Sequence, residues 1–195
     1  MEQDEFLRVA WRVMIQEKVE VKRMVFVDEV GTNTSLSSLY AWALKGQRAR
    51  WSTPRNRGPN TTLLASINSE GMGPCLAVVG SINAAVFEAY VEQALAPTLR
   101  PGQVVVMDNL SAHKGDRVRK LIEQHGCELL YLPPYSPDLN PIEEAFAKIK
   151  GLMRKAEART RRTLIETMGT AISAVTATDA RGYFDHCGYR LQSQL

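Results

Sequence analysis

Short runs of hydrophobic residues divide the chain into segments and predict buried β-strands. Two of these runs, at 24–27 and 104–107, are continuous and rich in β-branched residues, and each ends in an aspartate, Asp28 or Asp108. Weaker patterns predict further strands at 36–44, 61–67, 75–79 and 129–132. Strands that come first and then alternate with helices predict a mixed α/β domain.

Apolar residues at helical spacing predict the helices. The first covers about 3–18, and the residues expected to face the core are Phe6, Val9, Ala10, Val13 and Met14. Further helices are expected at 83–95, at 117–125 and from about 141. The last helix is expected to begin at Thr163, where Glu166 gives the spacing of a capping box, and to direct four residues inward: Ile165, Met168, Ile172 and Val175.

The start of the helix at about 141 is strongly marked. Asn140 is a favourable N-cap residue, and Pro141 occupies the first helical position, where proline is favoured. Each residue rotates by roughly 100° about a helix axis, so the apolar stripe that begins with Ile142 leaves Glu143 at its edge and Glu144 on the solvent side. Glu143 therefore has two interpretations: a carboxylate at the rim of a site, or a residue that completes a capping box with Asn140.

The composition is that of an ordinary soluble globular protein of about one domain. The chain has 195 residues, of which 45% are hydrophobic and 23% charged, which excludes a disordered or collagen-like chain. No apolar run approaches the ~20 residues of a membrane span, and the acidic N-terminus is unlike a secretory signal. The three cysteines are far apart, which argues against a disulfide framework or zinc knuckle and indicates a reduced, cytoplasmic compartment.

The net charge of +3 hides an uneven distribution of charge. The segment 45–57 carries +5 and the segment 148–162 carries +6, so the remainder of the chain carries −8. Clustered Lys and Arg are the electrostatic signature of a phosphate-binding surface, although two solvated faces of an ordinary protein would give the same counts. The candidate DNA-binding residues in these segments are Lys45, Arg48, Arg50, Arg55, Arg57, Lys150 and Arg154.

Three carboxylates are candidates for one catalytic centre. Asp28 and Asp108 end buried strands, where side chains emerge into the crevice in which α/β sheets place their sites, and Glu143 comes from the long helix. Such carboxylates repel one another unless divalent cations bind between them, and hard oxygen ligands suit Mg²⁺ or Mn²⁺. Two such ions serve phosphodiester chemistry by activating an attacking oxygen and stabilising a leaving one. Ordinary turn residues at strand ends are the alternative interpretation of the two aspartates.

The residues around these acids resemble the catalytic domain of DDE transposases, in the bacterial insertion-sequence branch of the mariner superfamily. The resemblance rests on the Asp28 strand, on Val-Met-Asp-Asn at 106–109 and on Ser-Pro-Asp-Leu-Asn-Pro-Ile-Glu at 136–143. The 34 residues between Asp108 and Glu143 match the length expected of this branch. Segments at 54–58, 109–114 and 184–189 also resemble the family, so the similarity covers most of the chain from about residue 22.

The resemblance implies a ribonuclease-H-like fold, in which a mixed sheet is flanked by helices. It implies an enzyme that cleaves DNA at transposon ends and joins the 3′-hydroxyl to target DNA. Asp28, Asp108 and Glu143 would be the catalytic residues and the ligands of two Mg²⁺ or Mn²⁺ ions, with Asn109 and His113 near the site. The implied partners are DNA and a second copy of the chain, as a homodimer during the reaction, with no membrane. The implied location is the bacterial cytoplasm, at the nucleoid.

Three aromatic or histidine residues have two interpretations each. His113 either acts at the site or makes a local hydrogen bond at the start of a helix. Trp42 and Trp51 either stack on DNA or pack within the fold, which is the more frequent role of an aromatic residue.

The N-terminal part departs from the family pattern. Only about 20 residues precede the first catalytic strand, which is enough for a helix or linker over 1–20 but not for the helix-turn-helix region that recognises transposon ends. The catalytic domain is therefore expected over 21–195, as a second reading frame, a truncated copy or an excised domain. The alternative function is a DNA-binding remnant without activity, or an inhibitor of a full-length transposase. A ribonuclease for RNA–DNA hybrids rests on fold analogy alone.

Overall fold

The computed structural model describes residues 4–190 except 39, 51, 54–57 and 110–114. The strands are β1 (Met24–Thr32), β2 (Thr61–Asn68), β3 (Gly71–Val79), β4 (Val104–Met107) and β5 (Glu128–Tyr131). The α-helices are α1 (Glu5–Lys18), α2 (Ala84–Tyr90), α3 (Asp116–Gln124), α4 (Pro141–Ala156), α5 (Arg161–Ser173) and α6 (Ala177–His186). Short 3₁₀ or π segments are η1 (Val21–Arg23), η2 (Val91–Leu95), η3 (Ala96–Thr98) and η5 (Pro137–Leu139). No described helix is long and apolar enough to cross a membrane.

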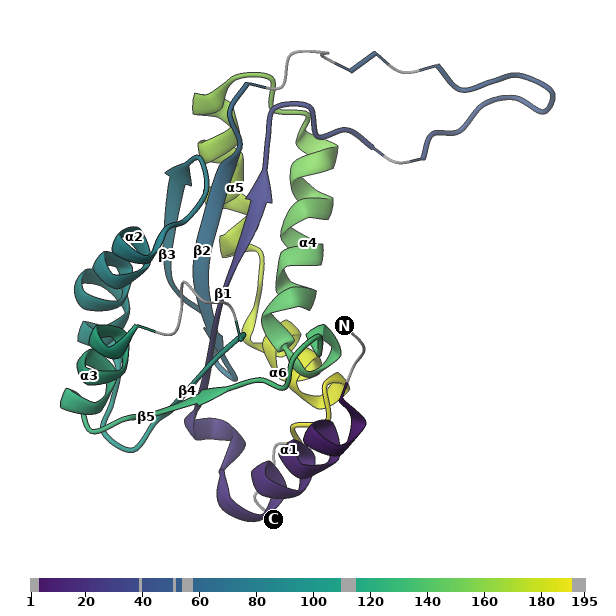
Figure 1. Cartoon of the computed structure of the whole chain (residues 1–195). Helices are drawn as coiled ribbons and strands as arrows, with labels where there is room; N and C mark the ends of the chain where they lie inside the picture. The colour runs from purple at the N-terminus through teal and green to yellow at the C-terminus, as the bar shows by residue number, and fades with distance from the viewer. Residues whose placement is uncertain (1–3, 39, 51, 54–57, 110–114, 191–195) are drawn as a thin grey trace.

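The strands form one five-stranded sheet in the order β3-β2-β1-β4-β5 (Figure 1). β2 pairs antiparallel with both β1 and β3, whereas β4 pairs in parallel with both β1 and β5. The parallel pair of β4 and β5 needs a crossover connection, which α3 supplies. The mixed sheet predicted from the order of strands and helices is therefore confirmed.

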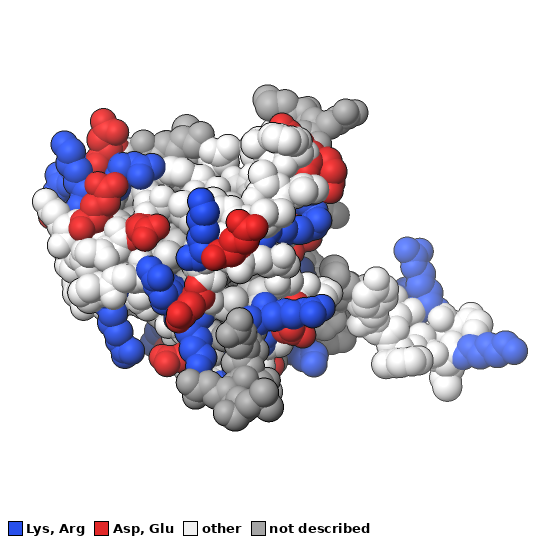
Figure 2. Space-filling model, turned by 90° about the horizontal axis from the view of Figure 1, so that it is seen from below, with Lys and Arg blue, Asp and Glu red and all other residues white. Residues whose placement is uncertain are grey.

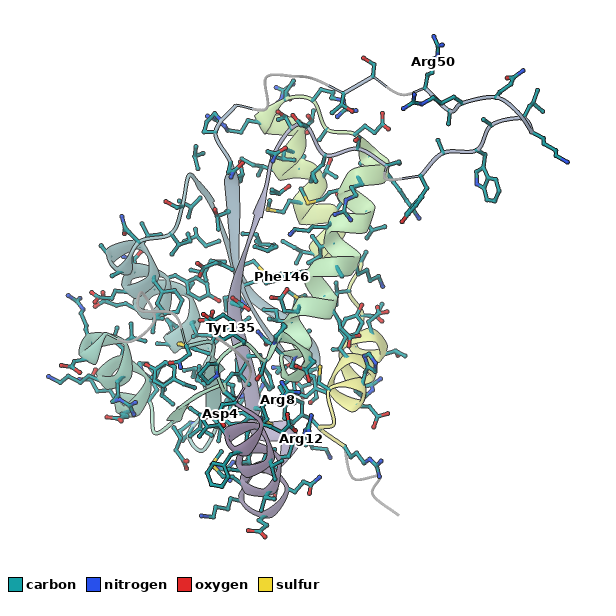
Figure 3. The ribbon with its side chains drawn as sticks, turned by 45° about the vertical axis from the view of Figure 1, so that its right-hand side comes forward. Asp4, Arg8, Arg12, Arg50, Tyr135 and Phe146 are labelled. Atoms are coloured by element: carbon teal, nitrogen blue, oxygen red, sulfur yellow. The ribbon has the colours of Figure 1, made fainter. Side chains whose placement is uncertain are left out.

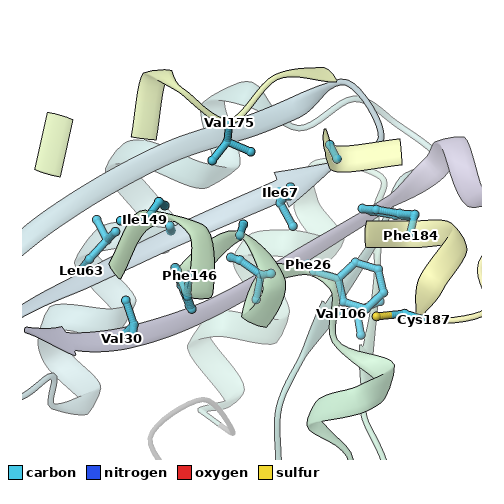
Figure 4. Close-up of a cluster of buried hydrophobic side chains, with 14 of the residues drawn as sticks. Phe26, Val30, Leu63, Ile67, Val106, Phe146, Ile149, Val175, Phe184 and Cys187 are labelled. Carbon is cyan, nitrogen blue, oxygen red and sulfur yellow. The ribbon is translucent and has the colours of Figure 1, made fainter. Parts of the chain in front are cut away.

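Both faces of the sheet are buried, because side chains along each strand alternate between two cores. In β1, Phe26 and Val30 belong to the core beneath α4, and Val25 and Val27 belong to the core beneath α2 and α3. Figure 4 shows part of the α4 core, in which Phe26 packs edge-to-face on Phe184 of α6 with ring centroids 5.3 Å apart. Burial on both faces explains why β1 and β4 appear in the sequence as continuous apolar runs.

The helices form two layers on the sheet. α1, α4, α5 and α6 lie over one face, and α2 and α3 lie over the other (Figure 1). α1 joins the first layer through Trp11 and Ile15, which are buried in the α4 core. α4 packs on β1 and β2, so it crosses the middle of the sheet.

Three strand predictions differ from the structure. The strand predicted at 75–79 begins four residues earlier, because β3 pairs with β2 from Gly71 onward. β1 does not end at Asp28 but continues to Thr32, because it remains paired with β2 after its pairing with β4 stops at Val27. The strand predicted at 36–44 is wrong, since the described residues of this segment form no strand. They lie in the long connection between β1 and β2, which projects from the domain (Figure 1). The described residues of 36–44 pair with neither edge of the sheet, which β3 and β5 form, so alternation of aromatic residues alone does not produce a strand there.

The first helix turns a different face to the core from the one predicted. Phe6, Val9 and Val13 are exposed on α1, and Arg8 is buried together with Trp11. The reason is that Arg8 finds hydroxyl and carboxylate partners in the segment before α4. Apolar spacing alone cannot reveal a buried ion pair, because it scores an arginine as a surface residue.

The C-terminal helices also differ from the prediction. α5 begins at Arg161, and its capping box joins Thr160 and Thr163 rather than Thr163 and Glu166. Ile165 is exposed on this helix, because the buried face is the one that carries Leu164, Met168 and Ala171. α6 has no counterpart among the predicted helices.

Candidate active site

Two aspartates stand side by side where β1 and β4 stop pairing. The parallel register aligns Phe26 with Val106, so Asp28 and Asp108 follow at the same level. Phe26 and Val106 face the α4 core. Because side chains alternate along a strand, the aspartates two residues further on are directed to that same face. Neighbouring strands lie roughly 4.8 Å apart, so this register brings the two carboxylates together beneath α4.

Asp28 is buried, with 7% of its surface exposed, although it is an acidic residue. Its Oδ1 accepts a hydrogen bond from the backbone N–H of Glu29 at 2.7 Å, and its Oδ2 accepts one from Asn140 Nδ2 at 2.8 Å. Such donors compensate for the cost of burying a carboxylate. Asp108, which follows the last residue of β4, is half-buried. The structure therefore holds Asp28 in one orientation by donors from β1 and from the start of α4.

α4 delivers Glu143 to the same side of the sheet. The helix begins with Asn140 at the N-cap position and Pro141 in the first turn, as predicted. The Asn140 side chain, however, makes no capping hydrogen bond and reaches Asp28 instead. The backbone N–H of Glu143 donates to the carbonyl of Asn140 at 3.1 Å. A capping box between Asn140 and Glu143 is therefore not formed, and Asn140 links the helix to the strand that carries Asp28.

Glu143 lies within the electrostatic reach of both Asp108 and Lys150. The residue as a whole is exposed, but nearby protein desolvates its carboxyl enough to raise the pKa above its ordinary value. Lys150, roughly two turns further along α4, opposes this and lowers the pKa of Glu143, whereas Asp108 raises it. Asp108 and Lys150 therefore act on the Glu143 carboxyl in opposite directions.

The donor atoms at this site suit a hard divalent cation. Within the part of the chain that the structure describes, no three His, Cys, Asp or Glu side chains are close enough to hold a metal ion. Beside Asp28, however, Oδ1 of Asn140 is buried without a hydrogen-bond partner, which is rare for a polar atom. Together with Asp28, Asp108 and Glu143 it makes an all-oxygen donor set, the kind that Mg²⁺ or Mn²⁺ prefers. The chemistry of the residues present therefore fits such an ion.

The basic residues of the segment 148–162 differ in their partners. Three of them form ion pairs with acidic neighbours: Lys148 with Asp179 at 2.7 Å, Arg159 with Glu157 at 3.5 Å and Arg162 with Glu166 at 3.9 Å. Lys150 and Arg154 lie on the Glu143 side of α4, and neither is in an ion pair with any described residue. The lower face of the domain, by contrast, mixes acidic and basic side chains (Figure 2).

The first basic segment lies away from these carboxylates. Figure 3 shows Arg50 on the projecting connection between β1 and β2, far from Phe146 of α4. The described basic residues of this segment are exposed: Lys45, Arg48 and Arg50. Trp42 in the same connection is 103% exposed, so packing within the domain is excluded for it. Arg55, Arg57 and Trp51 lie outside the described residues.

Two further residues, Asn109 and His113, were predicted to lie near the site. Asn109 is exposed directly after Asp108, and His113 lies outside the described residues.

Glu144 is not on the solvent side of α4, where the sequence predicted it. It is half-buried and hydrogen-bonded to His186, because α6 covers that side of α4. Sequence analysis also missed Arg8, which binds the segment before α4. A single sequence gives no signal that pairs an arginine with partners almost 130 residues away.

The chain belongs to the DDE superfamily endonucleases. This family matches residues 23–165, a range that contains Asp28, Asp108 and Glu143. The matched range begins beside β1 and extends into α5, so it includes the whole sheet and α4.

Two transposases are similar to it in sequence. The chain is 26% identical over 154 residues to the transposable element Tcb1 transposase of Caenorhabditis briggsae, covering 67% of this chain and 56% of that protein. It is 25% identical over 180 residues to the transposable element Tc1 transposase of Caenorhabditis elegans, covering 85% of this chain and 66% of that protein. The chain therefore spans less than two thirds of either relative.

Solved structures of Mos1 share the fold. The pre-cleavage Mos1 transpososome matches with a TM-score of 0.73 at 19% identity, covering 97% of this chain and 62% of that one. The Mos1 mariner paired end complex with Mn matches with a TM-score of 0.71 at 19% identity, covering 95% and 58%. The ribonuclease-H-like fold expected from the sequence is confirmed by these matches.

Proposed function

We propose that this chain is the catalytic domain of a DNA transposase, which cleaves DNA at transposon ends and joins the 3′-hydroxyl to target DNA. The observation that carries the proposal is that Asp28, Asp108 and Glu143, distant in sequence, are directed to one side of the sheet in a DDE endonuclease. Both relatives similar in sequence are transposases, which supports DNA as the substrate.

In this proposal Asp28, Asp108 and Glu143 are the catalytic residues and hold two Mg²⁺ or Mn²⁺ ions. When bound, the ions supply Lewis acids that activate an attacking oxygen and stabilise a leaving one. The chain itself orients the ligands, because Asn140 fixes Asp28 through its Nδ2 atom. Burial of Asp28 also keeps water from competing for that carboxylate. The solved Mos1 paired end complex with Mn supports the choice of metal.

Lys150 and Arg154 bind the DNA backbone beside the cleavage site. They lie roughly 10 and 17 Å along the helix axis from Glu143, on the same side of α4. Lys45, Arg48 and Arg50 are exposed on the projecting connection, from which they contact DNA further away. Paired-end chemistry requires two catalytic domains, so the proposed acting form is a homodimer.

Cleavage of DNA that carries the inverted repeats flanking the gene tests the proposal. With Mg²⁺ or Mn²⁺, wild type is expected to release cut product. Asp108→Ala is expected to lower the rate by more than about 100-fold, since even residues that only orient a metal ligand cost 10–100-fold. Asp116→Ala is the matched control, because Asp116 is an exposed aspartate at the start of α3, on the other side of the sheet. Its rate should stay at the wild-type value.

If wild type gives no more product than Asp108→Ala, the chain is not an active catalytic domain. The remaining interpretation is then a DNA-binding module without activity. The assignment to a bacterial insertion-sequence element, acting at the nucleoid, is part of the proposal and rests only on the resemblance of the sequence motifs, since the two relatives similar in sequence are nematode transposases. The nucleotide sequence around the gene tests it, because such an element predicts flanking inverted repeats and an upstream helix-turn-helix reading frame.

A further inference from the structure

α1 is tied to the segment before α4 by a buried arginine. Arg8 Nη1 donates hydrogen bonds to Ser136 Oγ at 2.9 Å and to Asp138 Oδ1 at 2.8 Å, and Nη2 donates to Asp138 Oδ2 at 2.6 Å. Arg8 is only 6% exposed and Ser136 only 5%. Two parallel bonds from one guanidinium to one carboxylate fix the orientation of both partners. The hydrogen bond from Arg8 also lowers the pKa of Asp138, so the carboxylate remains ionised in this pairing.

A second tie joins the same two parts of the chain. Trp11 Nε1 donates a hydrogen bond to Tyr189 Oη at 3.0 Å, and Tyr189 Oη donates to the carbonyl of Leu139 at 2.6 Å. All three residues are buried. Arg8 and Trp11 lie three positions apart and so share one face of α1. α1 therefore holds the segment 136–139 directly through Arg8, at Ser136 and Asp138, and indirectly through Tyr189, at Leu139.

The tied segment leads directly into the active site. Its 3₁₀ turn, η5, is followed by Asn140, whose Nδ2 binds Asp28 Oδ2, and Glu143 lies in the next turn. The residue before the segment, Tyr135, has a backbone φ of 54°, a left-handed conformation that non-glycine residues seldom adopt. Strained conformations of this kind persist only where the surrounding structure imposes them, and the ties from α1 are next to it.

We propose that α1 braces the active site and that Arg8 is a positioning residue for the metal-binding carboxylates. Arg8 holds the segment 136–138, this segment leads to Asn140, and Asn140 holds Asp28. The inference rests on the proposed function, which it deepens. If Arg8 contributed only to general stability, its loss would loosen the whole domain rather than the segment that enters α4.

Arg12 offers a matched control on the same helix. It lies one turn from Arg8 (Figure 3), carries the same charge and is exposed. It forms no hydrogen bond or ion pair with any described residue, and its charge adds only the smallest contribution to the lowered pKa of Asp138, for which the hydrogen bond from Arg8 is the main cause. Replacing it therefore changes the net charge of α1 in the same way as replacing Arg8 does, but leaves the ties to the segment 136–139 intact.

Amide hydrogen exchange tests the brace on the whole chain without any need for cleavage. Arg8→Gln is expected to speed exchange of the amides in 136–146 by about tenfold or more, while amides of β2 and β3 keep their protection, because only the region near the lost contacts opens more often. Arg12→Gln should match wild type. Equal acceleration in β2 and β3 would show general destabilisation and would overturn the proposal, as would unchanged exchange in 136–146.

Binding of Mn²⁺ tests the positioning role. Titration followed by electron paramagnetic resonance of free Mn²⁺ should show affinity falling by about 10–100-fold in Arg8→Gln and unchanged in Arg12→Gln, which is the usual cost of losing a residue that orients a ligand. Tyr189→Phe removes the hydroxyl that links Trp11 to Leu139 but keeps the ring. If Arg8→Gln does not fold, this variant replaces it in both measurements, with the same expected results. Local loosening with wild-type Mn²⁺ affinity would rule out positioning. If wild type itself neither binds Mn²⁺ nor cleaves, the proposed function fails, and the exchange result still decides whether the brace exists.

Discussion

Asn140 shows how one residue can occupy a standard position and do something else there. It precedes α4 at the N-cap, yet its side chain binds Asp28 and caps nothing. Asn83 occupies the same position before α2, and there the side chain accepts a hydrogen bond from the N–H of Val86 at 2.9 Å. The helix α4 begins without a side-chain cap because the side chain of its asparagine is bonded to Asp28 instead.

The two asparagines give a paired prediction. Asn83→Ala is expected to cost about 1 kcal/mol of unfolding free energy, the usual value of an N-cap, with no change in DNA cleavage. Asn140→Ala is expected to cost about 1.5–3 kcal/mol, since it removes a hydrogen bond to a charged group, and to slow cleavage by about 10–100-fold. Denaturant unfolding and cleavage rates of both variants test this. Equal cleavage rates in the two variants would contradict the role given to Asn140.

The hydrogen bond between His186 and Glu144 makes part of the stability depend on pH. Its acceptor Glu144 is the main cause of a raised His186 pKa, above the ordinary value of 6.5. A raised histidine pKa means that the stabilisation is fully present below about pH 6.5 and is lost as the pH rises through the higher, folded-state pKa. His186→Gln should therefore lower Tm slightly at about pH 6 and leave it unchanged at about pH 9. A difference in Tm that grows with pH would refute this assignment.

The candidate carboxylates could be found from the sequence because each has a local signature. Asp28 and Asp108 follow apolar runs, and Glu143 follows a proline at a helix start. Arg8 has no such signature, since its meaning comes from Ser136 and Asp138, which only the fold brings near. Local patterns therefore reveal the candidate catalytic residues but not the residues proposed to hold them in place.

At the scale of elements, α4 combines a buried stripe with a charged edge. Ile142, Phe146 and Ile149 pack in the core, while Lys150 and Arg154 lie on the edge that carries Glu143. Lys155 lies roughly 120° around the axis from Glu143 and is exposed. Of the three α4 cations that form no ion pair with a described residue, Lys150 and Arg154 lie on the side of the proposed cleavage site and Lys155 does not.

This geometry predicts how DNA affinity responds to salt. Lys150→Gln and Arg154→Gln are each expected to reduce the slope of log affinity against log salt by about 1, because one phosphate contact is lost in each. Lys155→Gln, which removes the same charge from another side of α4, should leave the slope unchanged. Binding measured by fluorescence anisotropy over a series of salt concentrations tests this. The same loss of slope in all three variants would mean that net charge alone matters.

Elements were predictable where burial dictates the pattern. β1 and β4 are buried on both faces, so their apolar runs are unambiguous. The segment 36–44 has an alternating pattern without a neighbour to pair with, and the apolar residues of α1 that looked like a core stripe are exposed while Arg8 is inside. Periodicity states which residues share a face, but the rest of the fold decides which face is buried.

At the scale of the whole molecule, α1 and the sheet share one hydrophobic core. Trp11 is 6% exposed in the α4 core, and its indole is hydrogen-bonded to Tyr189 near the other end of the described chain. Contacts of this kind join the unfolding of α1 to that of the sheet, as expected of a single cooperative core.

Trp11 can report on this cooperativity. In a chain with Trp42→Phe and Trp51→Phe, fluorescence from Trp11 and far-ultraviolet circular dichroism are expected to change at the same denaturant concentration, because a two-state transition looks the same to every probe. Wild type measured by circular dichroism alone is the control for the two substitutions. An earlier transition in fluorescence would show that α1 detaches before the sheet unfolds.

The ties between α1 and the C-terminal part of the domain also set an order of events during protein synthesis. Trp11 and Tyr189 are 178 residues apart, and Arg8 is 128 residues from Ser136. At about 5–20 residues per second a ribosome needs roughly 10–40 s to make the intervening chain. During that time α1 has already emerged but has nothing to hold. The segment that enters α4 is therefore held through Tyr189 only after the C-terminal part of this domain has been made, so a nascent chain carries all five described strands before it carries both ties.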